Sequence, residues 1–183
     1  MTLERREALA DQIVQSQPSL GAFVRDLTTD LSAGSWDLAS YSFQRGFEAM
    51  WDLAAADHSG LLHRPLLSLW RQSIELAIKS AILDLAGKIE GRPGHDLQKL
   101  FDQLLAVRAA EGCCDDDELT VRVQAMIASV QSFDPLADRF RYPAERNGKR
   151  YEGIAVDLDE LFQAHWIITT WCEGAVLELR GDV

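Results

Sequence analysis

The stretch LWRQSIELAIKSAIL, residues 69–83, carries the clearest helical pattern in the chain. Its apolar side chains recur every three or four residues, which places them along one face of an α-helix that must be buried against other helices. Pro65 lies just upstream and suits a first helical turn, because its missing N–H would have no partner there. We therefore expect one long buried helix from HRPLL to about residue 90. The apolar stripe consists of Ile74, Ala77, Ile78, Ala81, Ile82 and Leu85.

A polar stripe lies on another face of this expected helix. Arg71, Glu75 and Lys79 repeat every four residues, and Glu75 precedes Lys79 in the favourable orientation. On an exposed face such pairs stabilise a helix by only about 0.2–0.5 kcal/mol each. If part of the stripe is instead buried at a dimer cleft, the three residues form a candidate polar site. The sequence leaves both interpretations open.

Helical patterns also occupy most of the remaining chain, so we predict an all-α helical bundle. Its 183 residues suit a single domain. Asp96, the acidic run at residues 115–118 and Asp157 each stand where a helix should begin, and a carboxylate there accepts orphan backbone N–H groups. We expect two or three helices within residues 2–58, with a break around 32–35, then a helix from residue 95, one after residue 118 and one from Asp157 onward.

The segment RFRYPAERNGKRYEGIAV, residues 139–156, departs from the helical period. Its extended residues flank Asn147-Gly148, a pair that readily supplies the positive φ angles of a tight turn. We expect a small β-hairpin or extended loop here. Its cations and rings could hold phosphates and stack on RNA bases, could meet an acidic protein partner, or could simply keep an exposed edge from aggregating. The candidate binding residues are Arg139, Arg141, Tyr142, Arg146, Lys149 and Arg150.

The net charge and the composition of the sequence limit which partners the protein can bind. A net charge of −11 gives no general attraction to nucleic acid or anionic lipid, so any such contact must be local. The three cysteines have no zinc-ligand spacing, and the acidic run lacks the alternating ligands of a calcium loop. Neither an apolar signal region nor a long apolar run occurs. We expect a cytoplasmic protein with no metal, no cofactor and no membrane partner.

Four segments in a fixed order resemble one branch of the HEPN superfamily (higher eukaryotes and prokaryotes nucleotide-binding). They are LWRQSIELAIKSAIL, GHDLQKLF, FRYP with a following Gly148, and VDLDELF before a last helix. The match covers roughly residues 61–180, which leaves residues 1–60 as an N-terminal helical extension. The resemblance implies a helical bundle, frequently a homodimer, of the kind found in prokaryotic toxin-antitoxin, abortive-infection and other stress or defence systems.

The ribonuclease motif of that family is missing from this chain. Active members carry Arg, four to six intervening residues and then His, and none of the four histidines here has an Arg at that spacing. The nearest substitute is Arg92-Pro-Gly-His95, in which Arg92 could stabilise a phosphorane while His95 moves a proton of the 2′-hydroxyl.

Two functions therefore remain in view. The preferred one is a non-catalytic HEPN-like module, RNA-associated or protein-binding, in a prokaryotic defence, stress or toxin-antitoxin system. The alternative is a divergent metal-independent endoribonuclease that uses Arg92 and His95, with help from Lys88 or from His63 and Arg64.

Overall fold

The structure is a computed structural model that describes residues 34–145, 147–153 and 155–181, together with 4–5, 7–8 and 11–12. The chain divides into a unit of residues 1–31 and a compact unit of residues 32–183. The few described residues before position 13 are helical. The other helices expected before residue 34 lie outside the described residues.

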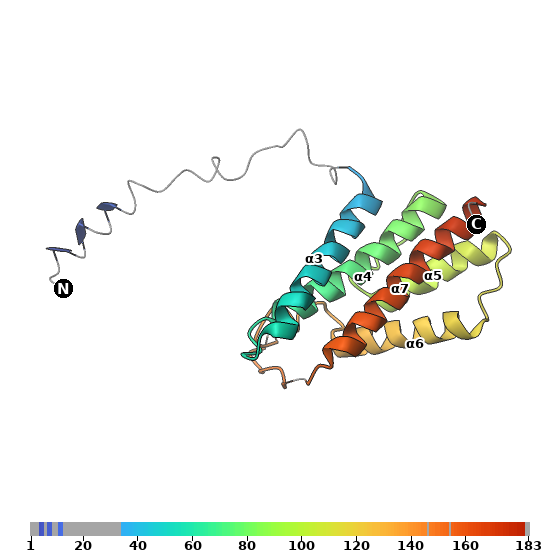
Figure 1. Ribbon diagram of the computed structural model, residues 1–183. Helices are drawn as coiled ribbons and strands as arrows, with labels where there is room; N and C mark the ends of the chain where they lie inside the picture. Colours follow the sequence, from blue (N-terminus) through green and yellow to red (C-terminus); the bar gives the residue numbers. More distant parts are fainter. Residues whose placement is uncertain are drawn as a thin grey trace. The chain divides into compact units, whose positions relative to one another are not determined.

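The compact unit is an all-α bundle, as the sequence predicted (Figure 1). It starts before residue 36, so the helix at 36–56 belongs to the bundle, although the sequence had placed it in an N-terminal extension. Its helices are α3 (Trp36–Ala56), α4 (His63–Ala86), α5 (Leu97–Ala110), α6 (Glu118–Phe133) and α7 (Leu158–Arg180).

Helix α4 is the centre of the bundle. It packs against α3, α5 and α7, and the apolar stripe predicted from the sequence supplies much of the core, with Ile74, Ile78 and Ile82 fully buried. The helix ends earlier than expected. Gly87 takes a φ of +70°, and its N–H bonds to the Leu83 carbonyl, which closes the last turn.

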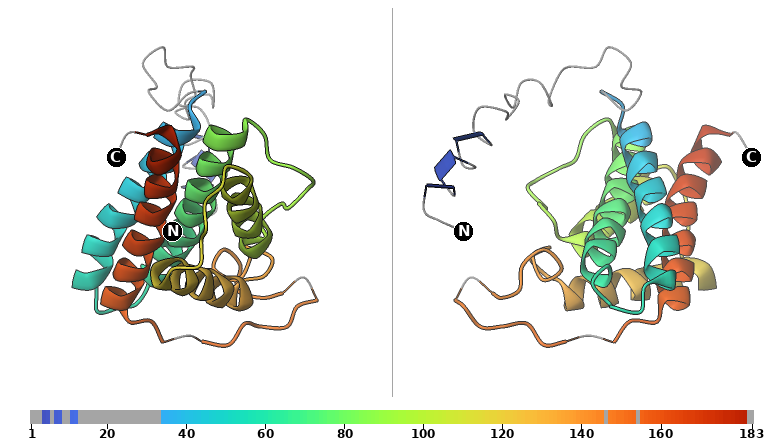
Figure 2. Two further views of the ribbon diagram at one scale, coloured as in Figure 1. Left: turned by 90° about the vertical axis from the view of Figure 1, so that its right-hand side faces the viewer. Right: turned by 60° about the vertical axis from the view of Figure 1, so that its left-hand side comes forward.

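Aspartate caps fix the starts of the three helices that follow α4. The side chain of Asp96 accepts a backbone N–H at the start of α5, and Asp117 and Asp157 each accept two at the starts of α6 and α7. The positions predicted from the acidic residues are therefore confirmed. These caps also set where the connecting segments leave the bundle, including the long segment between α6 and α7 that runs along one end of it (Figure 2).

That long segment contains the expected tight turn. A single antiparallel bridge joins Ala144 to Arg150, and Gly148 has a φ of +86°. The described part of the segment contains no strand beyond this bridge, so it is an extended loop with one tight turn.

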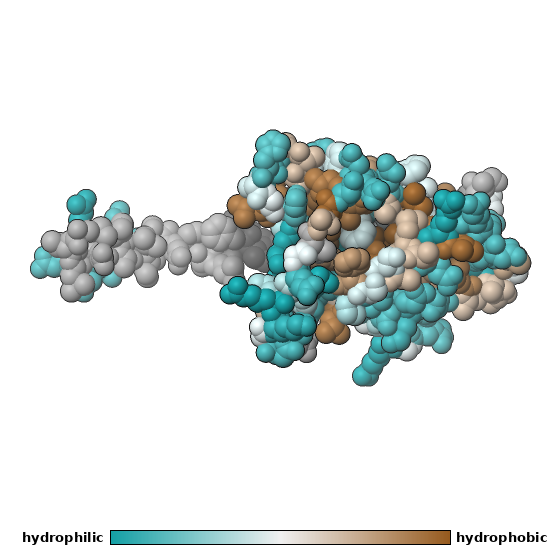
Figure 3. Space-filling model, turned by 90° about the horizontal axis from the view of Figure 1, so that it is seen from below, coloured by the Kyte–Doolittle hydropathy of each residue, from teal (hydrophilic) through white to brown (hydrophobic). Residues whose placement is uncertain are grey.

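Side chains at the surface are mixed in character. On the face shown in Figure 3, apolar side chains reach the surface in several places among hydrophilic ones. No helix in the described ranges is both long and apolar enough to cross a membrane. Within the same ranges, no three or more His, Cys, Asp or Glu side chains gather as metal ligands would.

Candidate functional site

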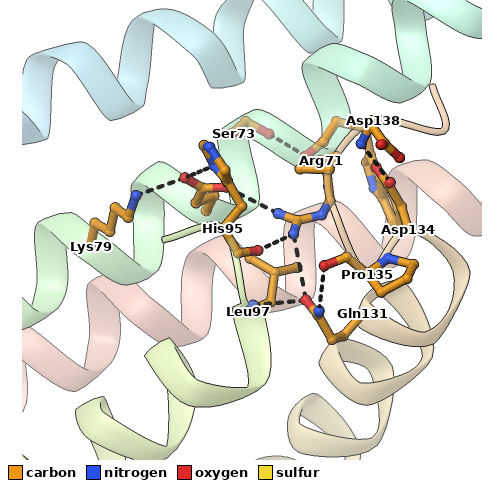
Figure 4. A network of polar contacts seen from close by, with 12 residues as sticks. Arg71, Ser73, Lys79, His95, Leu97, Gln131, Asp134, Pro135 and Asp138 are labelled. Atoms are coloured by element: carbon orange, nitrogen blue, oxygen red, sulfur yellow. Dashed lines mark hydrogen bonds and ion pairs between the residues drawn. The ribbon is translucent and has the colours of Figure 1, made fainter. Parts of the chain in front are cut away.

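The polar stripe of α4 is buried inside one chain. Arg71 and Glu75 are only 3% and 2% exposed, and Arg71 donates to the carbonyl of His95 in the segment that leads into α5 (Figure 4). Of the two settings considered from the sequence, the exposed face does not describe Arg71 and Glu75, and the dimer cleft stays a prediction. Burial changes the energetics, because a buried charge is costly unless it is paired and hydrogen-bonded.

The carboxylate of Glu75 is the shared hydrogen-bond acceptor of three neighbouring side chains. Glu75 accepts from Arg71 Nη1 at 3.2 Å and from Lys79 Nζ at 2.7 Å. The Nδ1 atom of His95 lies 3.0 and 3.1 Å from its two oxygens. Because an ionised carboxylate only accepts, it selects the tautomer of His95 that carries its proton on Nδ1. The other ring nitrogen, Nε2, is left to accept a proton or a ligand, and 53% of the His95 side chain is exposed.

Arg71 connects this carboxylate to two further segments. Its Nη2 donates to the His95 carbonyl and lies 3.5 Å from Gln131 Oε1 on α6. The same Gln131 oxygen accepts from the Leu97 N–H at 2.8 Å, and the Gln131 amide donates to the Pro135 carbonyl at 3.1 Å. The cluster therefore joins α4, the start of α5 and the end of α6 (Figure 4).

Arg71 is incompletely satisfied. Burial lowers the pKa of its guanidinium below the ordinary value, although the carboxylates of Glu75 and Asp134 act in the opposite direction. Its buried Nε has no hydrogen-bond partner within the described part of the chain. Buried polar atoms without partners are rare, and they concentrate at strained or functional positions.

We name Arg71, Glu75, Lys79 and His95 the Glu75 cluster.

The residues proposed to act with His95 do not join this cluster. Arg92 is exposed and lines a hollow of about 590 Å³ beside α5, and His95 is not part of the lining. Lys88 pairs with Glu90 at 2.7 Å. Arg64 instead donates to the carbonyls of Arg139 and Tyr142, in the loop that follows α6.

His63 stands near that same loop. It lines a hollow of about 230 Å³ together with Arg64 and Arg139, and His95 is not among the lining residues. Arg64 therefore anchors the loop, and His63 lies beside it.

Arg139 holds the basic loop together. It donates to the carbonyls of Phe133 at 3.2 Å and Glu152 at 3.3 Å. Its guanidinium lies 5.7 Å from the ring centroid of Phe133 and 5.8 Å from that of Tyr151. Tyr151 in turn donates to Asp138 at 2.7 Å, which raises the pKa of Tyr151 to about 12. Arg139 is thus engaged inside the loop and is not a free cation.

The other basic residues of the loop face solvent. Arg141, Lys149 and Arg150 are exposed, and Tyr142 is 56% exposed. The Arg141 guanidinium lies 6.0 Å from the Tyr142 ring centroid, and its Nε donates to the Ala137 carbonyl at 2.6 Å. Arg146 lies outside the described residues. We name Arg141, Tyr142, Lys149 and Arg150 the loop patch.

Two features of the site were not predicted from the sequence. The first is the contact between His95 and Glu75, which lie 20 residues apart. The second is Gln131, whose position on α6 carries no sequence signal that separates it from an ordinary helical glutamine.

Comparison with known proteins gives no match: neither a family model, nor a curated protein, nor a solved structure matches the chain. The chemistry of the two polar regions is therefore argued from their own contacts. The Glu75 cluster offers a carboxylate-oriented histidine, and the loop patch offers exposed cations that form no ion pair with another described residue, beside an exposed ring.

Proposed function

We propose that the chain is a non-catalytic, RNA-associated module of a prokaryotic defence or toxin-antitoxin system, related to the HEPN superfamily and acting as a homodimer. The family part of this proposal rests on the resemblance of the four sequence segments, and an all-α bundle is compatible with it. The RNA part rests on one observation, the composition and exposure of the loop patch.

The loop patch has the two properties that single-stranded RNA requires. Aromatic rings stack on unpaired bases, and cations contact the phosphates that join them. Tyr142 is 56% exposed, and Arg141, Lys149 and Arg150 are exposed on the same loop. Because the whole chain carries a net charge of −11, such a local concentration of positive charge is needed to hold a polyanion.

The loop is also anchored, so its exposed side chains have a defined place. Arg64 at the start of α4 donates to two loop carbonyls. The carboxylate of Asp134 accepts from the backbone N–H groups of Asp138 at 2.8 Å and Arg139 at 3.0 Å. Binding residues are commonly carried on loops that a rigid scaffold positions in this way. Because the loop is already anchored, it loses less conformational entropy when RNA binds.

A binding role fits the surroundings of His95 better than catalysis does. Metal-independent cleavage of RNA needs a cation on the pentavalent phosphorane beside the proton-transferring histidine. Arg71 is the arginine nearest to His95 by contact, but it is 3% exposed and its nitrogens are directed to Glu75, a backbone carbonyl and Gln131. It cannot reach a phosphate without leaving the core.

RNA binding is tested with a fluorescent single-stranded RNA and a triple variant, Arg141→Glu, Lys149→Glu and Arg150→Glu. We expect at least ten-fold weaker binding, and a logarithmic salt dependence reduced by about 2 because three phosphate contacts are lost. Tyr142→Ala should weaken binding by about 1–3 kcal/mol for one stacked base. Arg139 is left intact because it holds the loop.

The matched control reverses three exposed cations elsewhere, Lys88, Lys99 and Arg122. It changes the net charge by the same amount, so it should retain most of the affinity if the loop patch is the site. Equal losses in both triple variants, or no RNA binding by the native chain, would overturn the proposal. Retention of an acidic protein in place of RNA by the native loop would assign the patch to a protein partner.

The homodimer is tested by light scattering over a range of protein concentrations. The proposal expects a mass near twice the 20.4 kDa of the chain at micromolar concentration. A constant monomer mass up to millimolar concentration would remove the dimer from the proposal and leave the RNA test unaffected.

A second candidate, a metal-independent endoribonuclease, is favoured by the orientation of His95. A buried carboxylate on Nδ1 and a half-exposed ring are the arrangement of a general base, and the Lys79 side chain, 18% exposed, reaches the same carboxylate. Incubation with mixed RNA in EDTA tests it. Cleavage by the native chain that His95→Ala abolishes would establish the enzyme, and a further loss in Arg92→Ala would include Arg92.

A further inference from the structure

A hollow of about 310 Å³ lies between α3, α4 and α7, where α3 begins and where α4 and α7 end. It is separate from both the Glu75 cluster and the loop patch, because none of their residues lines it. Its volume is near the lower limit for small-molecule sites, which span about 300–1,000 Å³.

Three nearly buried polar side chains line this hollow. Ser40 is 4% exposed, and Gln44 and Ser80 are each 9% exposed. Among the described residues, none of the three makes a side-chain hydrogen bond, whereas other helical serines such as Ser73 and Ser129 bond to a backbone carbonyl. None of their polar atoms is both buried and unpartnered, so these atoms open onto the hollow, where water or a ligand can reach them. Their partner is therefore expected in the hollow itself.

The charges around the hollow select the sign of that partner. Asp37, Asp84 and Glu173 line it together with one cation, Arg180. Arg180 is bonded to Asp84 at 2.6 Å, so it compensates that carboxylate. Asp37 accepts from the Ser35 hydroxyl and the Leu38 backbone N–H and feels the charge of Arg180 without a direct ion pair, and no ion pair joins Glu173 to another described residue. Within the described part of the chain, Asp37 and Glu173 thus have no direct ion pair, and Arg180 is the one cation that lines the hollow with them.

The rest of the wall is apolar. Ala77 and Ala81 of α4 and Val176 and Leu177 of α7 face the same space. Small side chains on α4 keep the hollow open, since a larger residue at either alanine would fill it. An alkyl chain would lie against these residues, while charged groups at its ends reached the carboxylates.

We propose that this hollow binds a small aliphatic diamine. Its ammonium groups would pair with Asp37 and Glu173, its methylene chain would lie along the alanines, and the Gln44 amide and the two serine hydroxyls would accept the remaining N–H donors. Anions are disfavoured by the same two carboxylates. Neutral diols could satisfy the hydroxyls and the amide but would leave the carboxylates unpaired.

The experiment is a calorimetric titration of the full chain with 1,4-diaminobutane at low salt, beside succinate and 1,4-butanediol as probes of similar length. Saturable binding with one site per chain is expected for the diamine. Affinity for butanediol should be at least ten-fold weaker, and succinate should not bind. Absence of diamine binding at millimolar concentration would mean that the hollow holds water alone, and the proposal would fail.

Two variants locate the site. Gln44→Leu removes the buried amide at similar volume, and Glu173→Gln removes an exposed carboxylate without touching the core. Each should weaken diamine binding at least ten-fold, and Ser132→Ala, an exposed serine outside the hollow, should leave it unchanged. If Gln44→Leu fails to fold, Glu173→Gln alone decides. Unaltered affinity in Glu173→Gln would overturn the proposal, as would an equal loss in Ser132→Ala.

Discussion

Two arginines in the described part of the bundle, Arg71 and Arg108, are buried, and their environments are opposite. The Arg71 side chain is 4% exposed and shares the buried carboxylate of Glu75 with two other donors. The Arg108 side chain on α5 is 5% exposed and has two carboxylates, those of Asp115 and Glu178, each within 2.8 Å. Burial lowers the pKa of Arg71, whereas the hydrogen bonds that Arg108 donates to Asp115 raise the pKa of Arg108.

The difference separates a fully hydrogen-bonded arginine from one that is only partly hydrogen-bonded. The Nε of Arg108 donates to both oxygens of Asp115, its Nη1 donates to the Ala175 carbonyl, and its Nη2 reaches two carboxylates. All three of its nitrogens are thus satisfied. Arg71 keeps an unpartnered Nε and depends on one shared carboxylate. Burial of an arginine therefore does not by itself mark a stabilising ion pair; the number of carboxylates per cation does.

Glu75→Gln should give the largest loss of stability. It removes the one carboxylate that is bonded to Arg71 among the described residues and leaves a buried guanidinium without a bonded charged partner, which typically costs about 3–5 kcal/mol. Urea unfolding at pH 7 measures this loss. A loss below about 1 kcal/mol would mean that Asp134 or water compensates Arg71, and the contrast with Arg108 would disappear.

His165, a buried histidine with no ion pair to another described residue, tests whether burial alone shifts a pKa in this core. His165 lies against the Phe47 ring, and its Nε2 is 2.7 Å from the Ser73 hydroxyl. That hydroxyl donates to the Trp70 carbonyl, so it accepts from the neutral imidazole. Burial lowers the pKa of His165 from 6.5 to about 4.

The sign of the pH effect follows from this shift. Between pH 6.5 and about 4 the unfolded chain binds a proton that the folded chain does not, so stability falls as the pH falls through this window. The loss amounts to about 3 kcal/mol, at about 1.36 kcal/mol per pKa unit. Unfolding curves of the native chain and of His165→Gln at pH 7 and pH 4 measure it. Equal pH dependence in the two chains would contradict the prediction.

Asp115→Asn should have an intermediate effect. Arg108 loses one charged partner but keeps Glu178 and the Ala175 carbonyl, and the asparagine oxygen can still accept. We expect a loss of about 1–2 kcal/mol in the free energy of unfolding, less than for Glu75→Gln. Glu178→Gln is the matched control, because the Glu178 side chain is 62% exposed and its pair with Arg108 is screened. A loss as large as that of Glu75→Gln would place the two arginines in the same class.

The structural features that the sequence predicted are those that depend on residues close together in the chain. The apolar stripe of α4, the caps at Asp96, Asp117 and Asp157, and the turn at Gly148 follow from residues near one another in the chain. The contacts of Arg71 with Gln131 and of Arg108 with Ala175 bridge 60 and 67 residues, so they depend on how the helices pack. Spacing alone could not show that Arg71 and Glu75 are buried, because a stripe at four-residue intervals looks the same on an exposed face.

His95→Ala should have the smallest effect on stability. The histidine side chain is 53% exposed, so its pair with Glu75 is screened by water and contributes less than about 1 kcal/mol. Glu75 keeps Arg71 and Lys79 after the substitution. Urea unfolding at pH 7, beside Glu75→Gln, measures the difference. A loss equal to that of Glu75→Gln would make His95 a clamp of the same kind as Arg108, since a residue that holds the core together is not free to serve a ligand.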